Sequence, residues 1–442
     1  MRIIHTSDWH LGQYFYGKSR AAEHHAFMQW LLEQINIHQV DALIVAGDIF
    51  DTGTPPSYAR TLYNQFIVQI QQTGCQLILL GGNHDSVSTL NESKHLLACL
   101  NTVVIPGALE HFEEHVFTLK NRQGDVGAIL CGLPFLRPRD VVLSESGESS
   151  IDKQRKLGDA ISELYQRCFE QAEQLNNTFT TPVPIIATGH LTTVGASTSE
   201  SVRDIYIGSL DAFNAALFPA ADYIALGHIH RPQVVAKSEH IRYSGSPIAL
   251  SFDELAADNT TNKSVFLVEF SDSKLSQITP LMVPVFQPMQ VLKGDLDSIE
   301  QQISTFALQA ESAKTTWLSI EVSQQDYLSD LQSRIADMTQ DKAVEVLQLK
   351  RVRSQRQQHI KQLDNETLSE LSVDEVFGRR LSQEEFESES QQAQLGRIKQ
   401  RFSQVYAEVE SERNSQETAA SHVLQETSTE AVATKSATEG EQ

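Results

Sequence analysis

The sequence predicts an α/β layered protein, and three observations support this class. Short apolar runs are typical of buried strands, helical stretches lie between several of them, and polar residues follow where the runs end. The runs are rich in Ile, Leu and Val without polar alternation, as expected of strands buried on both faces. They occur in RIIHTSDWH, DALIVAGDIFD, LILLGGNHD, PIIATGH and YIALGHIH.

Two helices are predicted between the first strands, over residues 21–35 and 58–74, and the second meets a helix-terminating glycine at Gly74. Alternating strands and helices favour parallel pairing. In such sheets, functional side chains gather beyond the carboxyl ends of the strands.

A second, smaller α+β pattern follows residue 280. It predicts strands at 289–294, 315–323 and 343–352 and helices at 296–309 and 327–338. The stretch 349–361, LKRVRSQRQQHIK, is the most basic in the chain. Two interpretations stay open: a solvated strand edge guarded by cations, or a rim that contacts phosphates.

From residue 366 the pattern predicts two helices. Ser372 and Glu375 form a capping box at the first. In the second, apolar residues recur at spacings of three and four, as in a coiled-coil seam. They are Leu395, Ile398, Phe402, Val405 and Val409. After about residue 411 the Ser/Thr/Glu/Ala-rich chain is predicted to be disordered.

Polar side chains follow five of the predicted strands. Any one of these short motifs alone is more often a loop or a cap, but five in succession indicate a shared metal site. The candidate ligands are Asp8, His10, Asp48, Asn83, His190, His228 and His230. Gly47, Gly82, Gly189 and Gly227 each precede such a residue, and the missing Cβ atoms let the loops approach closely.

Seven ligands exceed the coordination of one ion and favour two ions that share a carboxylate. Imidazole, carboxylate and amide ligands without thiolates suit Mn²⁺, and also iron, zinc or, less well, Mg²⁺. Asp85 follows Asn83 and His84 directly. Two roles stay open for it: holding a neighbouring loop or ligand, or capping the next turn.

The motifs SDWH, GDIFD, GNHD, TGH and GHIH resemble those of the calcineurin-like metallophosphoesterases. Longer stretches, such as ADYIALGHIHRPQ and YSGSPIALSFDE, resemble the bacterial nuclease subunits of that family that act with a coiled-coil ATPase. The resemblance implies a β-sandwich flanked by helices over 1–280, a small α+β capping domain over 281–360 and a helical partner-binding segment over 361–410. Residues 411–442 remain as the disordered tail.

The same resemblance implies residue roles. Asp8, His10, Asp48 and His230 would hold a first ion, and Asp48, Asn83, His190 and His228 a second. His84 would protonate the leaving oxygen, and Asp51 would orient His84.

The implied reaction is metal-dependent hydrolysis of DNA phosphodiesters in DNA end processing. Related serine/threonine phosphatases carry arginines at the positions of Thr52 and Gly81 to clamp a phosphomonoester, and their absence favours a diester. The implied partners are DNA and a coiled-coil ATPase, with this chain a homodimer within a heterotetramer. Two alternatives stay open: a phosphodiesterase for small nucleotides, and a mainly structural tether of DNA ends.

The chain has 442 residues, enough for two or three domains, and a formal charge of −22. An acidic chain needs metal ions or a partner to supply the positive field that a polyanion requires. No apolar run is long enough for a membrane span, no leader precedes the first strand, and the four cysteines are scattered. We therefore expect a cytoplasmic protein that does not enter membranes.

Overall fold

The computed structural model describes residues 1–109, 111–141, 150–202, 212–256, 262–309, 314–323 and 331–352. All of them belong to one compact unit, Met1–Gln355. The predicted helical segment 361–410 and the tail 411–442 lie outside the described residues, as does the basic stretch beyond residue 352.

Two six-stranded sheets form the core of this unit. The first has the order β14 (Lys274–Met282), β13 (Ser264–Ser271), β1 (Arg2–Thr6), β4 (Ala42–Ala46), β5 (Gln76–Leu80) and β6 (Thr102–Ile105). The second has the order β11 (Gln233–Val235), β12 (Ser238–Tyr243), β10 (Tyr223–Gly227), β9 (Ile185–His190), β8 (Val126–Cys131) and β7 (Val116–Lys120).

Parallel pairing dominates the centre of each sheet. Strands β1, β4, β5 and β6 are parallel, as are β8, β9, β10 and β12, and antiparallel strands complete the edges. The carboxyl ends of the parallel strands therefore share an edge in each sheet, which is where the candidate ligands follow.

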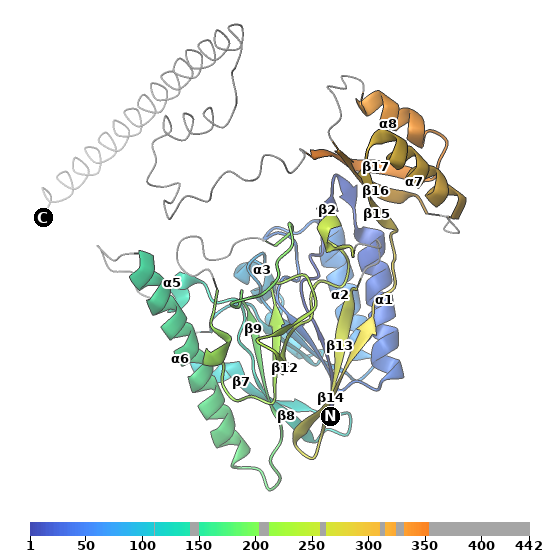
Figure 1. Cartoon of the computed structure of the whole chain (residues 1–442). Helices are drawn as coiled ribbons and strands as arrows, with labels where there is room; N and C mark the ends of the chain where they lie inside the picture. The colour runs from blue at the N-terminus through green and yellow to red at the C-terminus, as the bar shows by residue number, and fades with distance from the viewer. Residues whose placement is uncertain are drawn as a thin grey trace, which may run out of the picture. The chain divides into compact units, whose positions relative to one another are not determined.

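The two sheets pack face to face, and helices cover their outer faces. Along β4 the side chains alternate: Ile44 packs between the sheets, whereas Leu43 and Val45 pack toward the helices. Figure 1 shows α1 (Ala21–Ile37) and α2 (Ser57–Gln71) on one side and α6 (Ser150–Asn176) on the other. The predicted α/β class and the sandwich implied by the resemblance are both confirmed.

The helices form where their apolar positions recur at helical spacing. In α1 the buried residues include Phe27, Met28, Leu31 and Ile35, a stripe with a period near 3.6 residues. Helix α2 ends three residues before Gly74, which has a φ of 75°. The short elements are β2 (Tyr14–Phe15), β3 (Lys18–Ser19), α3 (Val87–Asn91), α4 (Lys94–Ala98), α5 (Pro138–Val141) and the 3-10 turns η1 (Phe112–His115), η2 (Ala215–Leu217) and η3 (Phe252–Glu254).

The predicted second α+β pattern is present. Strands β15 (Met289–Gly294), β16 (Thr316–Ser323) and β17 (Val344–Val352) form a parallel sheet, with α7 (Leu296–Gln309) and α8 (Leu331–Thr339) between them in sequence. Leu292, Ile320 and Ile335 belong to its own apolar core.

This sheet also contacts the sandwich through aromatic residues. Trp317 stacks on Phe15 of the β2–β3 hairpin, with ring centroids 5.6 Å apart and an interplanar angle of 10°. Lys350 of β17 forms an ion pair with Glu200 at 3.2 Å. No helix among the described residues combines the length and apolarity needed to cross a bilayer.

Candidate metal centre

The candidate ligands meet where β1, β4, β5, β9 and β10 end, so both sheets contribute to one site. Four of these residues have left-handed backbones: Asp8 (φ 53°), His10 (46°), Asp48 (50°) and His228 (92°). Such conformations are uncommon for residues other than glycine and concentrate at functional sites. They turn the side chains toward a common point.

The glycines before the ligands make this approach possible. A Cβ on Gly47 would overlap the His190 ring, one on Gly82 would overlap Asp48, and one on Gly227 would overlap the Ala46 carbonyl. The prediction that small residues let the loops converge is therefore confirmed at these three positions.

One cluster joins Asp8, His10 and His230, whose ligand atoms all lie within 4.8 Å of one another. All three side chains are buried. The Nε2 atom of His10 lies 3.7 Å from Oδ2 of Asp48, which links this cluster to the next.

The second cluster joins Asp48, His190 and His228 at the same spacing. His190 Nε2 lies 3.2 Å from Asp48 Oδ2 and 2.9 Å from the amide oxygen of Asn83. His228 Nδ1 lies 3.2 Å from that same oxygen. Asp48 thus lies between the clusters, where a bridging carboxylate would be needed.

The residues present fit a pair of divalent ions. His10 Nε2 and His228 Nε2 are buried without a hydrogen-bond partner in the described part of the chain, which is costly unless a further group binds there. Burial lowers the pKa of His190, but the charges of Asp48 and Asp8, together with hydrogen bonds to Asp48 and the Ala46 carbonyl, outweigh it and raise the pKa to about 9. Carboxylates and imidazoles are thus packed together where cations would bind between them.

His84 and Asp51 lie beside the first cluster. His84 Nδ1 donates to the backbone carbonyl of Asp51 at 2.7 Å, and the His84 backbone N–H donates to Asp48 Oδ1 at 2.8 Å. The Asp51 carboxylate instead contacts His10 Nδ1 at 3.1 Å. Asp51 therefore contacts two histidines, one through its main chain and one through its side chain. A ring nitrogen of His84 is also close enough to His10 and Asp48 to complete a ligand triplet.

A cavity of about 340 Å³ opens onto this face of the site, and its lining includes His10, Asp51, His84 and His230. Its described lining contains neither Lys nor Arg. A phosphate bound here would depend on other sources of positive charge.

Asp85 has the first of the two roles left open by the sequence. It is buried, and its carboxylate accepts hydrogen bonds from the backbone N–H groups of Ile49, Phe50 and Gly82 at 2.9–3.0 Å. It therefore joins the loop that carries Asp48 to the loop that carries Asn83.

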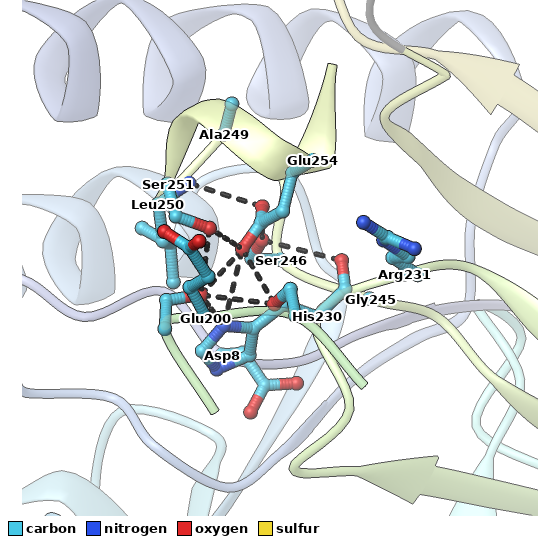
Figure 2. A network of polar contacts seen from close by, with 12 residues as sticks. Asp8, Glu200, His230, Arg231, Gly245, Ser246, Ala249, Leu250, Ser251 and Glu254 are labelled. Carbon is cyan, nitrogen blue, oxygen red and sulfur yellow. Dashed lines mark hydrogen bonds and ion pairs between the residues drawn. The ribbon is translucent and has the colours of Figure 1, made fainter. Parts of the chain in front are cut away.

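A buried polar network lies behind His230, and the metal motifs of the sequence did not predict it. Glu254 lies at its centre, as the dashed contacts in Figure 2 show. Lys263 donates to Glu254 at 2.5 Å, and Ser201 Oγ lies 2.6 Å from His230 Nδ1. Burial would raise the pKa of Glu254, but the charge of Lys263 and the hydrogen bonds from Lys263 and His230 together outweigh it and hold the pKa well below its usual value. The only sequence signal was the motif YSGSPIALSFDE, whose two acidic residues, Asp253 and Glu254, stand outside the metal motifs.

Comparison with known proteins supports the class that this fold and site define. Residues 1–232 match the family described as calcineurin-like phosphoesterase, and residues 285–385 match the type 5 capsule protein repressor C-terminal domain. The chain belongs to the calcineurin-like phosphoesterases.

Comparison with individual relatives identifies a smaller group within this family. The SbcD component of nuclease SbcCD from Escherichia coli is 56% identical over 395 residues, which cover 89% of this chain and 96% of the relative. The corresponding protein of Rhodobacter capsulatus is 35% identical over 64% of this chain and 70% of its own, and that of Bacillus subtilis 28% identical over 74% and 81%. Within the family, the chain is a member of the SbcD nucleases, and it is a phosphodiester hydrolase.

Proposed function

We propose that the chain hydrolyses DNA phosphodiesters with two divalent ions, preferably Mn²⁺. The first position is formed by Asp8, His10, Asp48 and His230, and the second by Asp48, Asn83, His190 and His228. The observation that carries this assignment is the pair of overlapping clusters, with two buried imidazole nitrogens lacking partners among the described residues.

When bound, ions at these positions supply an acidified water and neutralise the charge of the phosphate. The side chains around them determine geometry. Asp48 sets the spacing between the positions, and the amide of Asn83 adds an oxygen ligand without a further negative charge.

His84 is assigned to proton transfer rather than to the ligand set. Its Nδ1 donates to the Asp51 carbonyl, and its ring lines the cavity. We assign to Nε2 the proton that the leaving oxygen needs. Asp51 acts as a positioning residue, because its carbonyl orients His84 and its carboxylate orients His10.

The relatives' names imply a multi-subunit nuclease, and we propose an SbcC-type coiled-coil ATPase as the partner of this chain. The predicted partner-binding segment 361–410 follows the second α+β region, 281–360, for which we propose the role of a DNA-facing cap. We further propose a homodimer within a heterotetramer, acting in the cytoplasm on DNA ends during repair, recombination and replication.

The test uses the full chain after chelation, with Mn²⁺, Mg²⁺ or Zn²⁺ added back. We expect cleavage of hairpin DNA with Mn²⁺ and none of cyclic nucleotides. Asp48→Ala should bind fewer than two Mn²⁺ per chain and cleave nothing, because the bridging carboxylate serves both positions. Asp125→Ala, which changes an exposed aspartate in the β7–β8 turn, is the matched control.

Two results would contradict the proposal. Turnover of cyclic nucleotides without DNA cleavage would favour a small-nucleotide phosphodiesterase. Normal Mn²⁺ stoichiometry in Asp48→Ala would remove the shared carboxylate from the scheme.

A further inference from the structure

The histidines of the two proposed metal positions differ in the groups that contact the ring nitrogen facing away from the ion. In the first position, His10 Nδ1 contacts the Asp51 carboxylate at 3.1 Å. His230 Nδ1 contacts Ser201 Oγ at 2.6 Å and Glu254 Oε1 at 3.4 Å. Both imidazoles of this position therefore have a carboxylate behind them.

The second position has no such support among the described residues. His190 Nδ1 donates to the neutral backbone carbonyl of Ala46 at 2.9 Å. His228 has one nitrogen at the Asn83 amide oxygen, and its other nitrogen is buried without a hydrogen-bond partner. No described carboxylate from outside the proposed ligand set contacts either ring.

Glu254 is held firmly enough to act on His230. Its Oε1 accepts from Ser199 at 3.0 Å, and its Oε2 accepts from the Leu250 backbone at 3.0 Å and from Lys263. Ser201 bridges the ring and the carboxylate, so the His230 N–H can donate to Ser201 while Ser201 donates to Glu254. This arrangement favours Nδ1 as the protonated nitrogen, which leaves Nε2 as the ligand atom.

We infer that the two metal positions are unequal, and that Ser201 and Glu254 make the first one tighter by holding the Nδ1 edge of His230. This inference rests on the proposed ligand assignment. A carboxylate behind an imidazole orients the ring and increases its basicity, so the ring binds a cation more strongly. Loss of such a partner typically weakens metal binding by about 10–100-fold.

The inequality has a consequence for how the site fills. At limiting metal the first position fills while the second remains exchangeable. Glu254 is thus a positioning residue for the first ion, and the supply of the second ion determines how much protein is fully loaded.

The experiment titrates Mn²⁺ into the chelated full chain, following free Mn²⁺ by electron paramagnetic resonance and heat by calorimetry. We expect two separate steps in the parent chain. In Glu254→Gln, which preserves size but removes the charge, the first step should weaken by at least about 10-fold while the second changes little. The second position is the internal control, because a general loss of structure would weaken both steps.

Two further variants strengthen the test. Asp125→Asn changes an exposed carboxylate in the β7–β8 turn, outside this network, and it should leave both steps unchanged. Ser201→Ala removes only the bridging hydroxyl and should weaken the first step by a smaller factor. If Glu254→Gln fails to fold, Ser201→Ala still tests the inference, because an unchanged first binding step in Ser201→Ala would overturn it.

Equal affinities for two ions in the parent chain would also overturn it, as would a selective loss of the second step in a folded Glu254→Gln protein. These results leave the proposed metal centre intact. A parent chain that binds no Mn²⁺ refutes the proposed function itself, and the inference falls with it.

Discussion

Replacing Asp85 with Asn tests whether one buried carboxylate holds the metal-binding loops together. Oδ2 of Asp85 accepts from Ile49 and Gly82, and Oδ1 accepts from Phe50. An amide oriented with its oxygen at the Oδ2 position keeps two of these three bonds. Its NH₂ group then faces the Phe50 N–H, which loses its acceptor.

The magnitude follows from this count. Losing one hydrogen bond to a charged acceptor costs about 1.5–3 kcal/mol, and the two that remain become neutral and weaker. Burial and the nearby charge of Asp48 raise the pKa of Asp85 to about 6, so removing the charge relieves repulsion and offsets part of the loss. We expect Asp85→Asn to lower the free energy of unfolding by about 2 kcal/mol, and Asp85→Ala, which loses all three bonds, to lower it further.

The assay is thermal unfolding of the parent chain and both variants, with chelator and then with excess Mn²⁺. Asp125→Asn, an exposed aspartate, serves as the control. The melting temperature should fall by a few degrees in Asp85→Asn, and Mn²⁺ should raise it less than in the parent because the Asp48 and Asn83 loops are less well aligned. Unchanged melting temperatures in both Asp85 variants would refute this account.

Two other predictions concern catalysis and assembly. His84→Asn should leave both Mn²⁺ ions bound but lower DNA cleavage by roughly 100-fold, the usual scale for losing a proton-transfer group. Loss of Mn²⁺ in calorimetry would place His84 among the ligands. Full DNA processing by this variant would favour a tethering role for the protein. A chain ending at residue 362 retains the whole unit Met1–Gln355 and should keep its melting temperature and its cleavage of single-stranded DNA. In a pull-down, this shorter chain should no longer capture the ATPase. Undiminished capture would exclude docking through the segment 361–410.

The proposed ligands could be predicted from the sequence because each lies at the end of an apolar strand or within a few residues of it. A separate alternation of strand and helix patterns predicted the strands of the smaller sheet. The sandwich itself could not be derived this way, because a buried strand has the same pattern in either sheet. Only the fold reveals that β1 pairs with β13, where Ile3 lies opposite Val268.

The residues that support the ligands had no comparable signal. Glu254 and Lys263 are nine positions apart in the sequence, and they meet behind His230 only in the folded chain. The contacts of Asp51 were also not predictable from the sequence, although this residue is close to its partners along the chain. Its proximity to His84 was expected, but which of its atoms faces which histidine depends on the backbone of the loop after β4, where Asp48 is left-handed.

The charges around the site explain how an acidic chain can hold a phosphodiester. The proposed ligands include two carboxylates, Asp8 and Asp48, and Asp51 adds a third beside them, whereas Glu254 is balanced by Lys263. The Asp85 carboxylate lies close enough to Asp48 for their charges to interact, so two divalent cations would bring four positive charges to four carboxylates, and bound cations are often the largest local charges in such a site. The described lining of the cavity offers no Lys or Arg. Metal binding would therefore offset the negative charge of these carboxylates, and the ions proposed for hydrolysis would supply the attraction that draws a phosphate into an otherwise acidic cleft.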